Sequence, residues 1–240
     1  MTVVVITGAN RGLGLETARQ LFETVPGIKI VLGSRDVSKV SATVADFVKR
    51  GYAASAVQLE VTDAASVKAA VASVEKAHGG VLDVLINNAG VASWVGPLEV
   101  TADDLRKTFE VNVVGTVVVT QAFLPLLRKS EAGRIVNVSS ILGSLGEHSD
   151  PNSPFSKILV PAYDISKAGV NVYTVELAQA LKDTKIKVNA AHPGWVKTDM
   201  GGENAPLEIK DGVATMLQLA TLPADGPTGG FFHVGVHLRW

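Results

Sequence analysis

The chain has 240 residues, enough for one large α/β domain or two small ones. Hydrophobic residues make up 47% of it and charged residues 19%, which supports a substantial core and excludes a globally disordered chain. The formal net charge of -1 provides no bulk field that would favour nucleic acid or anionic membranes. Because cysteine is absent, disulfides and thiolate catalysis are excluded, and we expect a cytoplasmic protein.

The chain begins with an apolar run, Met1 to Ile6, that has no basic segment before it and no cleavage site after it, so we expect a strand rather than a signal peptide. Short β-branched runs then alternate with longer amphipathic segments. The expected strands are Val3–Thr7, Lys29–Leu32, Ala56–Leu59, Leu82–Asn87, Arg134–Val138 and Lys187–Ala191. The expected helices include Leu13–Glu23, Ala64–Ala77, Ala102–Leu127 and Ser166–Leu181. This alternation predicts parallel βαβ units with right-handed crossovers.

The continuous apolar character of the first strand indicates a sheet that is covered on both faces. No linker or evident repeat divides the chain, so we predict one domain over residues 1–240. Its expected fold is a doubly wound, Rossmann-type α/β fold, with a mainly parallel sheet of about seven strands and helices on both faces.

Two stretches depart from this regular alternation. The longest uncharged stretch, Val111 to Leu127, is shorter than the roughly 20 residues that a membrane span needs, and it contains polar residues. We therefore expect a buried helix and no membrane partner. The stretch from Gly143 to Pro161 is rich in Gly, Ser, Pro and Asp, and we expect a long loop that is either functional or disordered.

A glycine-rich turn, Thr7 to Gly14, follows the first expected strand and opens the first expected helix, with the spacing Gly-x-x-x-Gly-x-Gly. Glycines let the backbone approach a pyrophosphate, and the helix N-terminus adds free N–H groups and positive potential. Any tight strand–helix turn favours glycine, but the place of this one, at the first such junction, favours a dinucleotide cofactor. The expected cofactor contacts are Gly8, Asn10, Arg11, Gly12, Leu13 and Gly14.

The end of the second expected strand bears on which dinucleotide binds. About 20 residues after the glycine turn, a NAD-specific site has an acid that holds the ribose hydroxyls. Here this place holds Ser34 and Arg35, a hydroxyl and a guanidinium that suit a 2′-phosphate. Arg11 adds a second positive charge. Either arginine taken alone could also be an ordinary solvated surface residue. The pair favours NADP(H) over NAD(H), and Asp36 is the alternative group for the ribose.

A tyrosine and a lysine, Tyr163 and Lys167, lie four residues apart, a spacing that on a helix puts both side chains on one face. A phenol with a pKa near 10 exchanges protons poorly at neutral pH. A nearby cation favours the phenolate, so we expect the lysine to lower the pKa of the tyrosine. By itself the spacing is common by chance and also fits a structural pair.

Six segments in order make the chain resemble the short-chain dehydrogenase/reductase family over essentially its full length. They are Thr7-Gly8-x-x-x-Gly12-x-Gly14, Asn87-Asn88-Ala89-Gly90, Asn112, Val138-Ser139-Ser140, Tyr163-x-x-x-Lys167 and Pro193-Gly194. The run Gly194 to Met200 is similar to the carbonyl reductase branch in particular, and Gly226 to Phe232 resembles the last strand of the family.

The resemblance implies a role for each matching residue. Tyr163 would be the catalytic acid/base, and Lys167 would hold the nicotinamide ribose and tune the tyrosine. Ser140 would orient the substrate, rather than Ser139, because it directly precedes a short apolar stretch that ends in glycine. Strand alternation also puts the two serines on opposite sides. Asn112 would anchor a water relay to Lys167, or else be a satisfied amide in the core.

The resemblance also implies the remaining lining of the site. Further cofactor contacts would come from Glu60, Val61, Asn88, Ala89, Gly90, Pro193, Gly194, Val196 and Thr198, with Asn87 as a structural brace. Glu60 stands where the family usually has Asp, so its place in the adenine pocket is open. Candidate substrate walls are Trp94, Leu142 and Trp195, each of which also fits ordinary core or surface.

His148 and His192 do not have the spacing of metal ligands, so we expect no metal. The function predicted by the resemblance is NADPH-dependent reduction of aldehydes, ketones or quinones, reversible as oxidation of a secondary alcohol. The alternatives are an NAD-dependent alcohol or steroid-type dehydrogenase and a non-catalytic NADP(H) sensor. The resemblance leaves the oligomeric state open between a homodimer, a homotetramer and a monomer, the last because of the extended loop between Gly146 and Val160.

Overall fold

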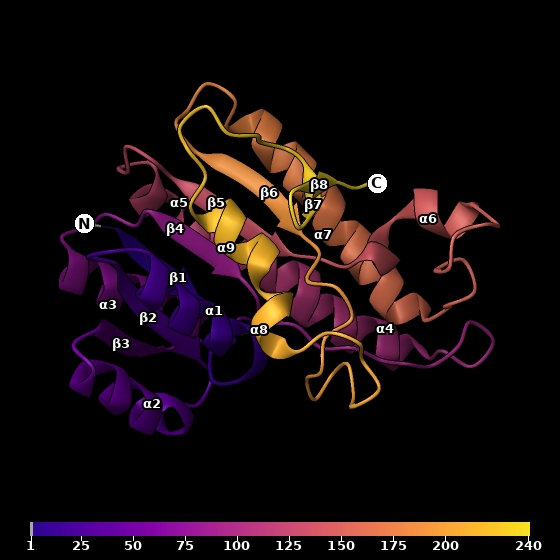
Figure 1. Cartoon of the computed structure of the whole chain (residues 1–240), viewed down its shortest axis with the longest axis horizontal. Helices are drawn as coiled ribbons and strands as arrows, with labels where there is room; N and C mark the ends of the chain where they lie inside the picture. The colour runs from indigo at the N-terminus through magenta and orange to yellow at the C-terminus, as the bar shows by residue number, and fades with distance from the viewer. Residues whose placement is uncertain (1) are drawn as a thin grey trace.

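The computed structural model describes residues 2–240 and is built on one eight-stranded sheet in the order β3-β2-β1-β4-β5-β6-β7-β8 (Figure 1). The strands are β1 Val3–Ile6, β2 Lys29–Ser34, β3 Ala53–Gln58, β4 Val84–Asn87, β5 Arg134–Val138, β6 Lys187–Ala191, β7 Phe231–His233 and β8 Val236–His237. All neighbouring pairs are parallel except β7 with β8, which is a short antiparallel edge. The predicted doubly wound, mainly parallel fold is confirmed, with the edge strand β8 as an addition.

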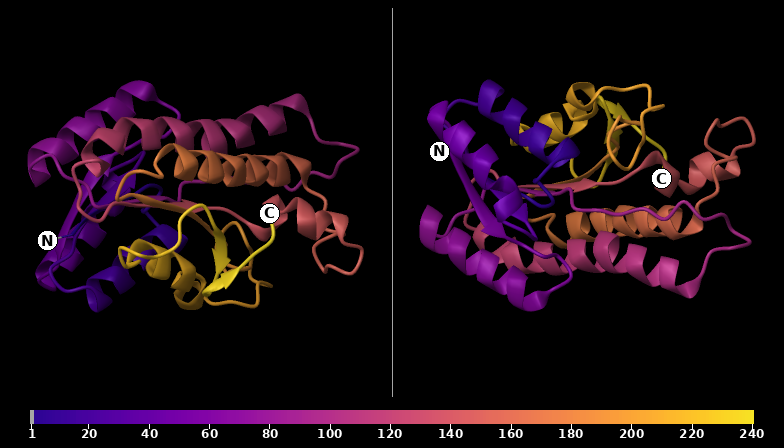
Figure 2. Two further views of the ribbon diagram at one scale, coloured as in Figure 1. Left: turned by 90° about the horizontal axis from the view of Figure 1, so that it is seen from above. Right: turned by 90° about the horizontal axis from the view of Figure 1, so that it is seen from below.

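Helices cover both faces of this sheet (Figure 2). The α-helices are α1 Gly12–Thr24, α2 Ser38–Lys49, α3 Ala64–His78, α4 Ala102–Phe109, α5 Thr116–Leu127, α6 Leu145–Ser149, α7 Pro161–Ala180, α8 Ile209–Gly212 and α9 Ala214–Ala220. In Figure 2, α3, α4, α5 and α7 form one layer, and α1, α2, α8 and α9 lie on the opposite face. Helix α2 was not among the helices expected from the sequence.

Strand alternation in β1 divides the core between these two layers. The side chains of Val3 and Val5 join the apolar cluster that contains residues of α3, α5 and α7. Those of Val4 and Ile6 join the cluster that contains residues of α1, α2 and α9. Because successive side chains of a strand point to opposite faces, a fully buried strand must be apolar at every position, as this one is.

The segment expected to be one helix over residues 102–127 contains a π-helical turn, Glu110–Gly115, between α4 and α5. Such turns are rare and frequently mark functional sites. Taken together, Ala102–Leu127 is long and apolar enough to cross a membrane by length and composition alone, and half of its most apolar window is buried. Val119, Phe123 and Leu126 of α5 pack into the core beneath the sheet, as expected for a core helix.

The stretch between β5 and α7 is more regular than its composition predicts. It contains a 3₁₀ turn, Ile141–Gly143, followed by α6. The C-terminal segment ties α6 down, because Arg239 forms ion pairs with Glu147 and Asp150 and the carbonyl of Trp240 accepts from the Gly146 N–H at 2.8 Å. This segment therefore has a defined conformation beside the start of α7.

Candidate active site

Strand order reverses between β1 and β4, so the segments that follow these strands diverge at the carboxyl edge of the sheet. Ligands of open parallel sheets bind outside this edge, at the point of reversal. The segments that follow β1, β2, β4, β5 and β6 carry nearly all of the residues that the sequence singles out. The candidate active site therefore lies at this edge.

The glycine turn after β1 is packed against the segment after β4. Gly8 has a φ of +62°, and a Cβ added to it would lie 2.9 Å from the Cα of Ala89, so only glycine fits there. The Thr7 hydroxyl accepts from the N–H groups of Asn88 and Ala89, at 3.0 and 2.9 Å. Thr7, which the sequence analysis gave no role of its own, joins the two segments at the point of reversal.

Helix α1 begins directly after this turn, at Gly12. No side chain caps it, and its first turn holds no acidic residue. The first N–H groups of a helix have no partner within the helix and carry its positive end. This arrangement fits a pyrophosphate, since an anion can accept from the free N–H groups without displacing a carboxylate.

The two asparagines after β4 serve as braces. The Asn88 amide donates to the carbonyls of Thr7 and Gly8, at 2.9 and 3.2 Å. The Asn87 amide donates to the Thr120 hydroxyl and to Asn137, both at 2.8 Å. Asn87 is thus placed as the sequence predicts, whereas the Asn88 side chain supports the glycine turn and leaves its main chain, with Ala89 and Gly90, to face the site.

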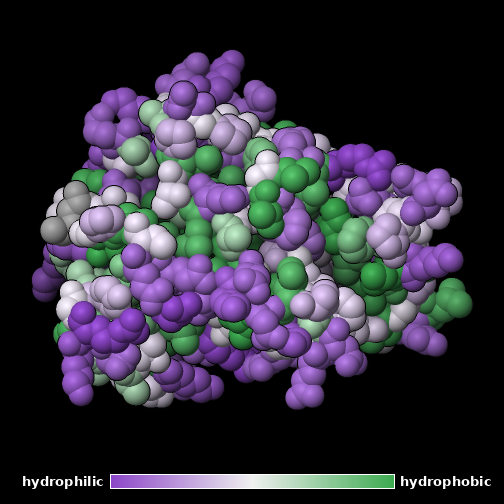
Figure 3. Space-filling model, viewed as in Figure 1, coloured by the Kyte–Doolittle hydropathy of each residue, from purple (hydrophilic) through white to green (hydrophobic). Residues whose placement is uncertain are grey.

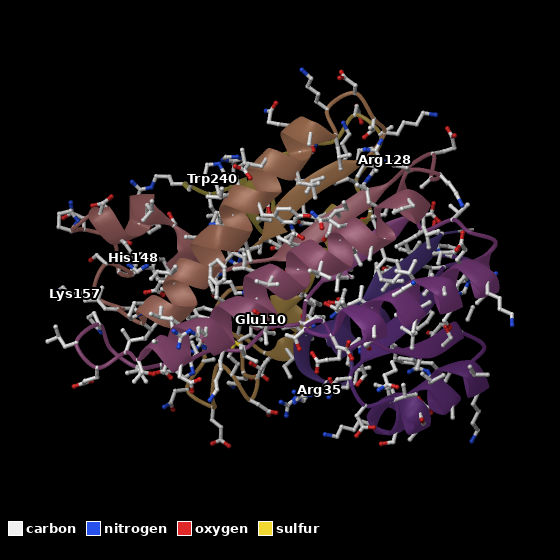
Figure 4. The ribbon with its side chains drawn as sticks, turned by 180° about the vertical axis from the view of Figure 1, so that it is seen from behind. Arg35, Glu110, Arg128, His148, Lys157 and Trp240 are labelled. Atoms are coloured by element: carbon white, nitrogen blue, oxygen red, sulfur yellow. The ribbon has the colours of Figure 1, made fainter. Side chains whose placement is uncertain are left out.

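At the end of β2, the side chains of Ser34, Arg35 and Asp36 differ in whether they are already hydrogen-bonded within the chain. The Asp36 carboxylate accepts from the N–H and hydroxyl of Ser38, at 3.0 and 2.6 Å, and these bonds lower its pKa. The Ser34 hydroxyl donates to the Asp36 carbonyl at 2.8 Å, so its proton closes this turn. Arg35 is exposed, projects from the strand end and has no ion pair within residues 2–240 (Figure 4). Of the three side chains, the guanidinium is the one that remains available.

Arg11 lies across the glycine turn from the segment after β6. Its guanidinium forms an exposed ion pair with Asp199. The methyl carbon of Thr198 is the nearest atom to a Cβ placed on Gly12, at 3.9 Å, so the space over Gly12 is open. Asn10 and Leu13 complete the turn, and both are partly buried.

The side chains of Glu60 and Val61, which were expected to contact the cofactor, have other partners in the structure. The Glu60 carboxylate accepts from the N–H and hydroxyl of Thr62, at 3.2 and 3.0 Å. The Val61 side chain is buried in the core, where a Cβ added to Gly115 would lie 2.8 Å from it. Contacts from these two residues to a ligand would therefore have to come from the main chain or after rotation of Glu60.

The segment after β6 turns sharply at Pro193-Gly194. Gly194 has a φ of +90°, and a Cβ there would lie 2.4 Å from Leu207, so glycine is required. The Val196 side chain is buried, and its strand-like bridge to Leu207 fixes the loop. The Thr198 hydroxyl accepts from the Gly201 N–H at 3.1 Å.

Tyr163 lies in the first turn of α7, which begins at Pro161, a favourable first helical residue. Its side chain is buried, beside Ser140 and Leu142. Burial raises the pKa of Tyr163 to about 12, a hydrogen bond with the Ser140 hydroxyl opposes this rise, and the charge of Asp164 adds to it. At neutral pH the phenol is therefore protonated.

The two serines at the end of β5 face in opposite directions. The Ser139 hydroxyl is buried against Asn171, to which it donates at 2.6 Å. The Ser140 oxygen accepts from the Leu142 N–H at 3.2 Å and lies at the Tyr163 phenol. The serine predicted from the sequence is the one that the structure places beside the tyrosine.

Lys167 lies one turn along α7, with its Nζ 5.5 Å from the centre of the Tyr163 ring. The Nζ donates to the carbonyl of Val138 at 2.7 Å, and burial lowers the pKa of Lys167 to about 8. A Cβ on Gly90 would lie 3.7 Å from this Nζ, so the segment after β4 also reaches the ammonium. The raised pKa of Tyr163 has burial as its largest cause. That Lys167 lowers the pKa of the tyrosine stays a prediction.

Asn112 lies in the π-helical turn, and its amide is fully used. The oxygen accepts from the Val91 N–H at 2.8 Å, and the nitrogen donates to the Val91 carbonyl and the Ser166 hydroxyl. The side chain therefore matches the satisfied core amide rather than a direct partner of Lys167. It joins the segment after β4 to α7 immediately beside the tyrosine and lysine.

The candidate substrate walls differ in their contacts. The Trp94 ring lies 5.4 Å from the Tyr163 ring, centre to centre, and 53% of Trp94 is exposed. Leu142 is buried in the cluster that contains Tyr163. Trp195 is exposed, and its indole N–H donates to the Gly201 carbonyl at 2.8 Å. Figure 3 shows hydrophobic side chains among hydrophilic ones on the right of the view.

The two histidines considered for a metal lie apart. The His148 Nε2 donates to the Leu142 carbonyl at 2.8 Å and is 3.8 Å from the Asp164 carboxylate, on the segment beside the start of α7 (Figure 4). His192 pairs with His233 instead, with ring centres 5.0 Å apart. Within residues 2–240, no group of three His, Asp or Glu side chains could hold a metal ion.

The chain is similar to known dehydrogenases and reductases. The family model for short chain dehydrogenase matches residues 2–208. Carbonyl reductase [NADPH] 1 of Homo sapiens is 33% identical, and the match covers 95% of each chain. The (+)-neomenthol dehydrogenase of Arabidopsis thaliana is 32% identical and covers 95% of this chain and 94% of its own.

Solved structures agree with these relatives. NADPH-bound carbonyl reductase from chicken fatty liver superimposes with a TM-score of 0.89 at 31% identity, over 100% of this chain and 94% of its own. Carbonyl reductase Sniffer of D. melanogaster gives a TM-score of 0.88 at 30% identity, over the whole of both chains. These matches confirm the resemblance found in the six sequence segments. The chain belongs to the short-chain dehydrogenase family.

Proposed function

We propose that this chain is an NADPH-dependent reductase of aldehydes, ketones or quinones in which Tyr163 donates the proton. The observation that carries this proposal is the placement of a protonated, buried phenol beside the Ser140 hydroxyl, with the Lys167 ammonium one helical turn away. All three lie at the carboxyl edge of the sheet. The uncapped N-terminus of α1 lies at the same edge. The human and chicken relatives carry NADPH in their names, which supports the same cofactor here.

NADP(H) would be held along the edge from β2 to β6. The first N–H groups of α1 would receive the pyrophosphate, and the free guanidinium of Arg35 would receive the 2′-phosphate. The main chain from Asn88 to Gly90 would line one ribose, and Lys167 would hold the other. Pro193, Gly194, Val196 and Thr198 would hold the nicotinamide end. When bound, the nicotinamide supplies the hydride that a carbonyl carbon needs.

The residues of the chain then supply the proton and the orientation. The Ser140 hydroxyl and the Tyr163 phenol would both donate to the carbonyl oxygen of the substrate. As negative charge grows on this oxygen, the phenol proton moves to it, and the charged Lys167 favours the phenolate left behind. Trp94 and Leu142 would flank the substrate at the tyrosine.

The test is a comparison of initial rates with NADPH and NADH across a panel of aldehydes, ketones and quinones. We expect NADPH oxidation that depends on the carbonyl substrate, and a kcat/KM that is higher with NADPH than with NADH. A preference for NADH would favour an NAD-dependent alcohol dehydrogenase. Tight NADPH binding with no turnover on any member of the panel would favour a non-catalytic sensor.

A further inference from the structure

The imidazole of His192 lies directly behind the turn that carries Ser140. The Ile141 N–H donates to its Nδ1 at 3.2 Å. The main chain of His192 is held by two hydrogen bonds, since its N–H donates to the Phe232 carbonyl at 2.8 Å and its carbonyl accepts from the His233 Nδ1 at 2.9 Å. The imidazole is therefore a rigid acceptor set against a short turn.

This contact continues the ladder between β5 and β6 beyond the point where the two strands part. In register, Val138 lies opposite Ala191, and the next N–H, that of Ser139, donates to the Ala191 carbonyl at 2.8 Å. The following N–H on the same side of the strand belongs to Ile141. The chain of β6 has by then turned away at Pro193, and the side chain of His192 takes the place of the missing carbonyl.

The N–H groups from Ile141 to Ser144 thereby all have acceptors. The Leu142 N–H donates to the Ser140 hydroxyl oxygen at 3.2 Å, and the N–H groups of Gly143 and Ser144 donate to the carbonyls of Ser140 and Ile141, at 2.9 and 3.0 Å. A buried N–H without an acceptor is unfavourable, so loss of the Nδ1 acceptor would make the turn shift towards another partner or water. Such a shift would move the Ser140 hydroxyl relative to the Tyr163 phenol.

We infer that His192 is a positioning residue for catalysis, whose Nδ1 holds the Ile141 N–H and through it the orientation of the Ser140 hydroxyl. The inference rests on the proposed function, because it assigns His192 an effect on the reaction only through Ser140. It requires the neutral imidazole with its proton on Nε2, since Nδ1 accepts. Burial and the neighbouring His233 lower the pKa of His192 to about 3, which keeps that form throughout the neutral range.

Two amide substitutions distinguish the effect of the hydrogen-bond acceptor from the effect of losing the imidazole ring. His192→Asn can place its amide oxygen as many bonds from the backbone as Nδ1, whereas His192→Gln places it one bond further away. We expect His192→Gln to lower kcat about tenfold to a hundredfold, the scale of a buried N–H left unpaired, with the KM for NADPH little changed. His192→Asn should recover most of that loss. The exposed His237, changed to Gln, is the matched control and should keep the wild-type kcat.

A double-mutant cycle with Ser140→Ala tests the route of the effect. If His192 acts through the serine, His192→Gln should cost less than about twofold further in the Ser140→Ala background, measured by single turnover. The inference is overturned if His192→Gln keeps the wild-type kcat, if His192→Asn is as impaired as His192→Gln, or if the full loss persists without Ser140. Because the comparison is made between active variants, these outcomes differ from a failure of the proposed function, in which Tyr163→Phe would keep wild-type turnover.

Discussion

The rings of Trp94 and Tyr163 lie with their centres 5.4 Å apart and their planes inclined by 43°, so one residue after β4 shields one side of the phenol at the start of α7. Just over half of Trp94 is exposed, which leaves aromatic surface free beside the tyrosine. An aromatic ring in this position offers a substrate dispersion and edge contacts in addition to apolar burial.

Substitution Trp94→Ala should therefore act on the larger substrates. We expect kcat/KM for an aromatic ketone to fall about tenfold, in line with the roughly 0.5 to 1.5 kcal/mol of an aromatic pair plus lost apolar contact. The value for a small aliphatic aldehyde should change much less, because such a substrate does not reach the indole. Steady-state kinetics on both substrates check this, and an equal loss for the two would contradict a role for Trp94 as a substrate wall.

The pH dependence of the reaction should follow Lys167 rather than Tyr163. Burial lowers the pKa of Lys167 to about 8 and raises that of Tyr163 to about 12. As the pH rises through 8 the amine loses its charge, while the phenol keeps the proton that it donates. We expect kcat/KM for carbonyl reduction to fall from about pH 8 upwards, as seen in a pH–rate profile with NADPH. A profile that stays level to pH 10 would be inconsistent with a charged Lys167 in the reaction.

Unfolding is not expected to cause this fall. The pKa of Lys167 is lower in the folded chain than in the unfolded chain, so between about pH 8 and 10 the unfolded chain binds more protons at this residue. The contribution of Lys167 to the free energy of unfolding therefore rises with pH in this window, while the activity falls. Denaturant unfolding at about pH 7.5, just below this window, and at about pH 9.5, inside it, separates the two effects.

Selectivity for the 2′-phosphate should depend on Arg35. The substitution Arg35→Asp replaces the free guanidinium at the end of β2 by a carboxylate, which would repel a phosphate. We expect kcat/KM with NADPH to fall by roughly one to two orders of magnitude, the scale of one charged hydrogen bond plus repulsion. NADH lacks the phosphate and serves as the internal control, so its kcat/KM should hold or rise. Unchanged kinetics with NADPH would exclude Arg35 from the phosphate site.

The sheet was predictable where its strands are short apolar runs bounded by turns, as β1 and β4 are. The expected bounds of β3 were displaced, because this strand is mostly exposed or half-buried. Burial on both faces demands apolar residues at every position, and β1 shows this directly. The edge strand β8 has only two residues, both exposed, so it leaves no apolar pattern. Helix α2 is not among the expected helices, although Val40, Val44 and Phe47 repeat at helical spacing along it, with Val40 and Phe47 buried.

The placement of a site residue was predictable where its chemistry follows from its residue type and spacing. It was less predictable where the side chain could bind either of two partners. The spacing of Tyr163 and Lys167 on one helix holds in the structure, and Ser140 lies beside the phenol. The partners of Asn88 and Glu60 depend on backbone directions that a sequence does not contain. His192 could be recognised only as a possible ligand, because its acceptor role requires the divergence of β5 and β6 after their last paired residues.

The most direct test of the account is the turnover of Tyr163→Phe, which removes the phenolic hydroxyl and keeps the ring. Rates of NADPH oxidation with a reducible carbonyl should be measured together with NADPH binding by fluorescence. We predict that turnover falls by about a hundredfold to ten-thousandfold, the usual contribution of a positioned proton donor, while NADPH still binds. Turnover close to that of the wild type, with NADPH bound, would contradict the assignment of Tyr163 as the proton donor.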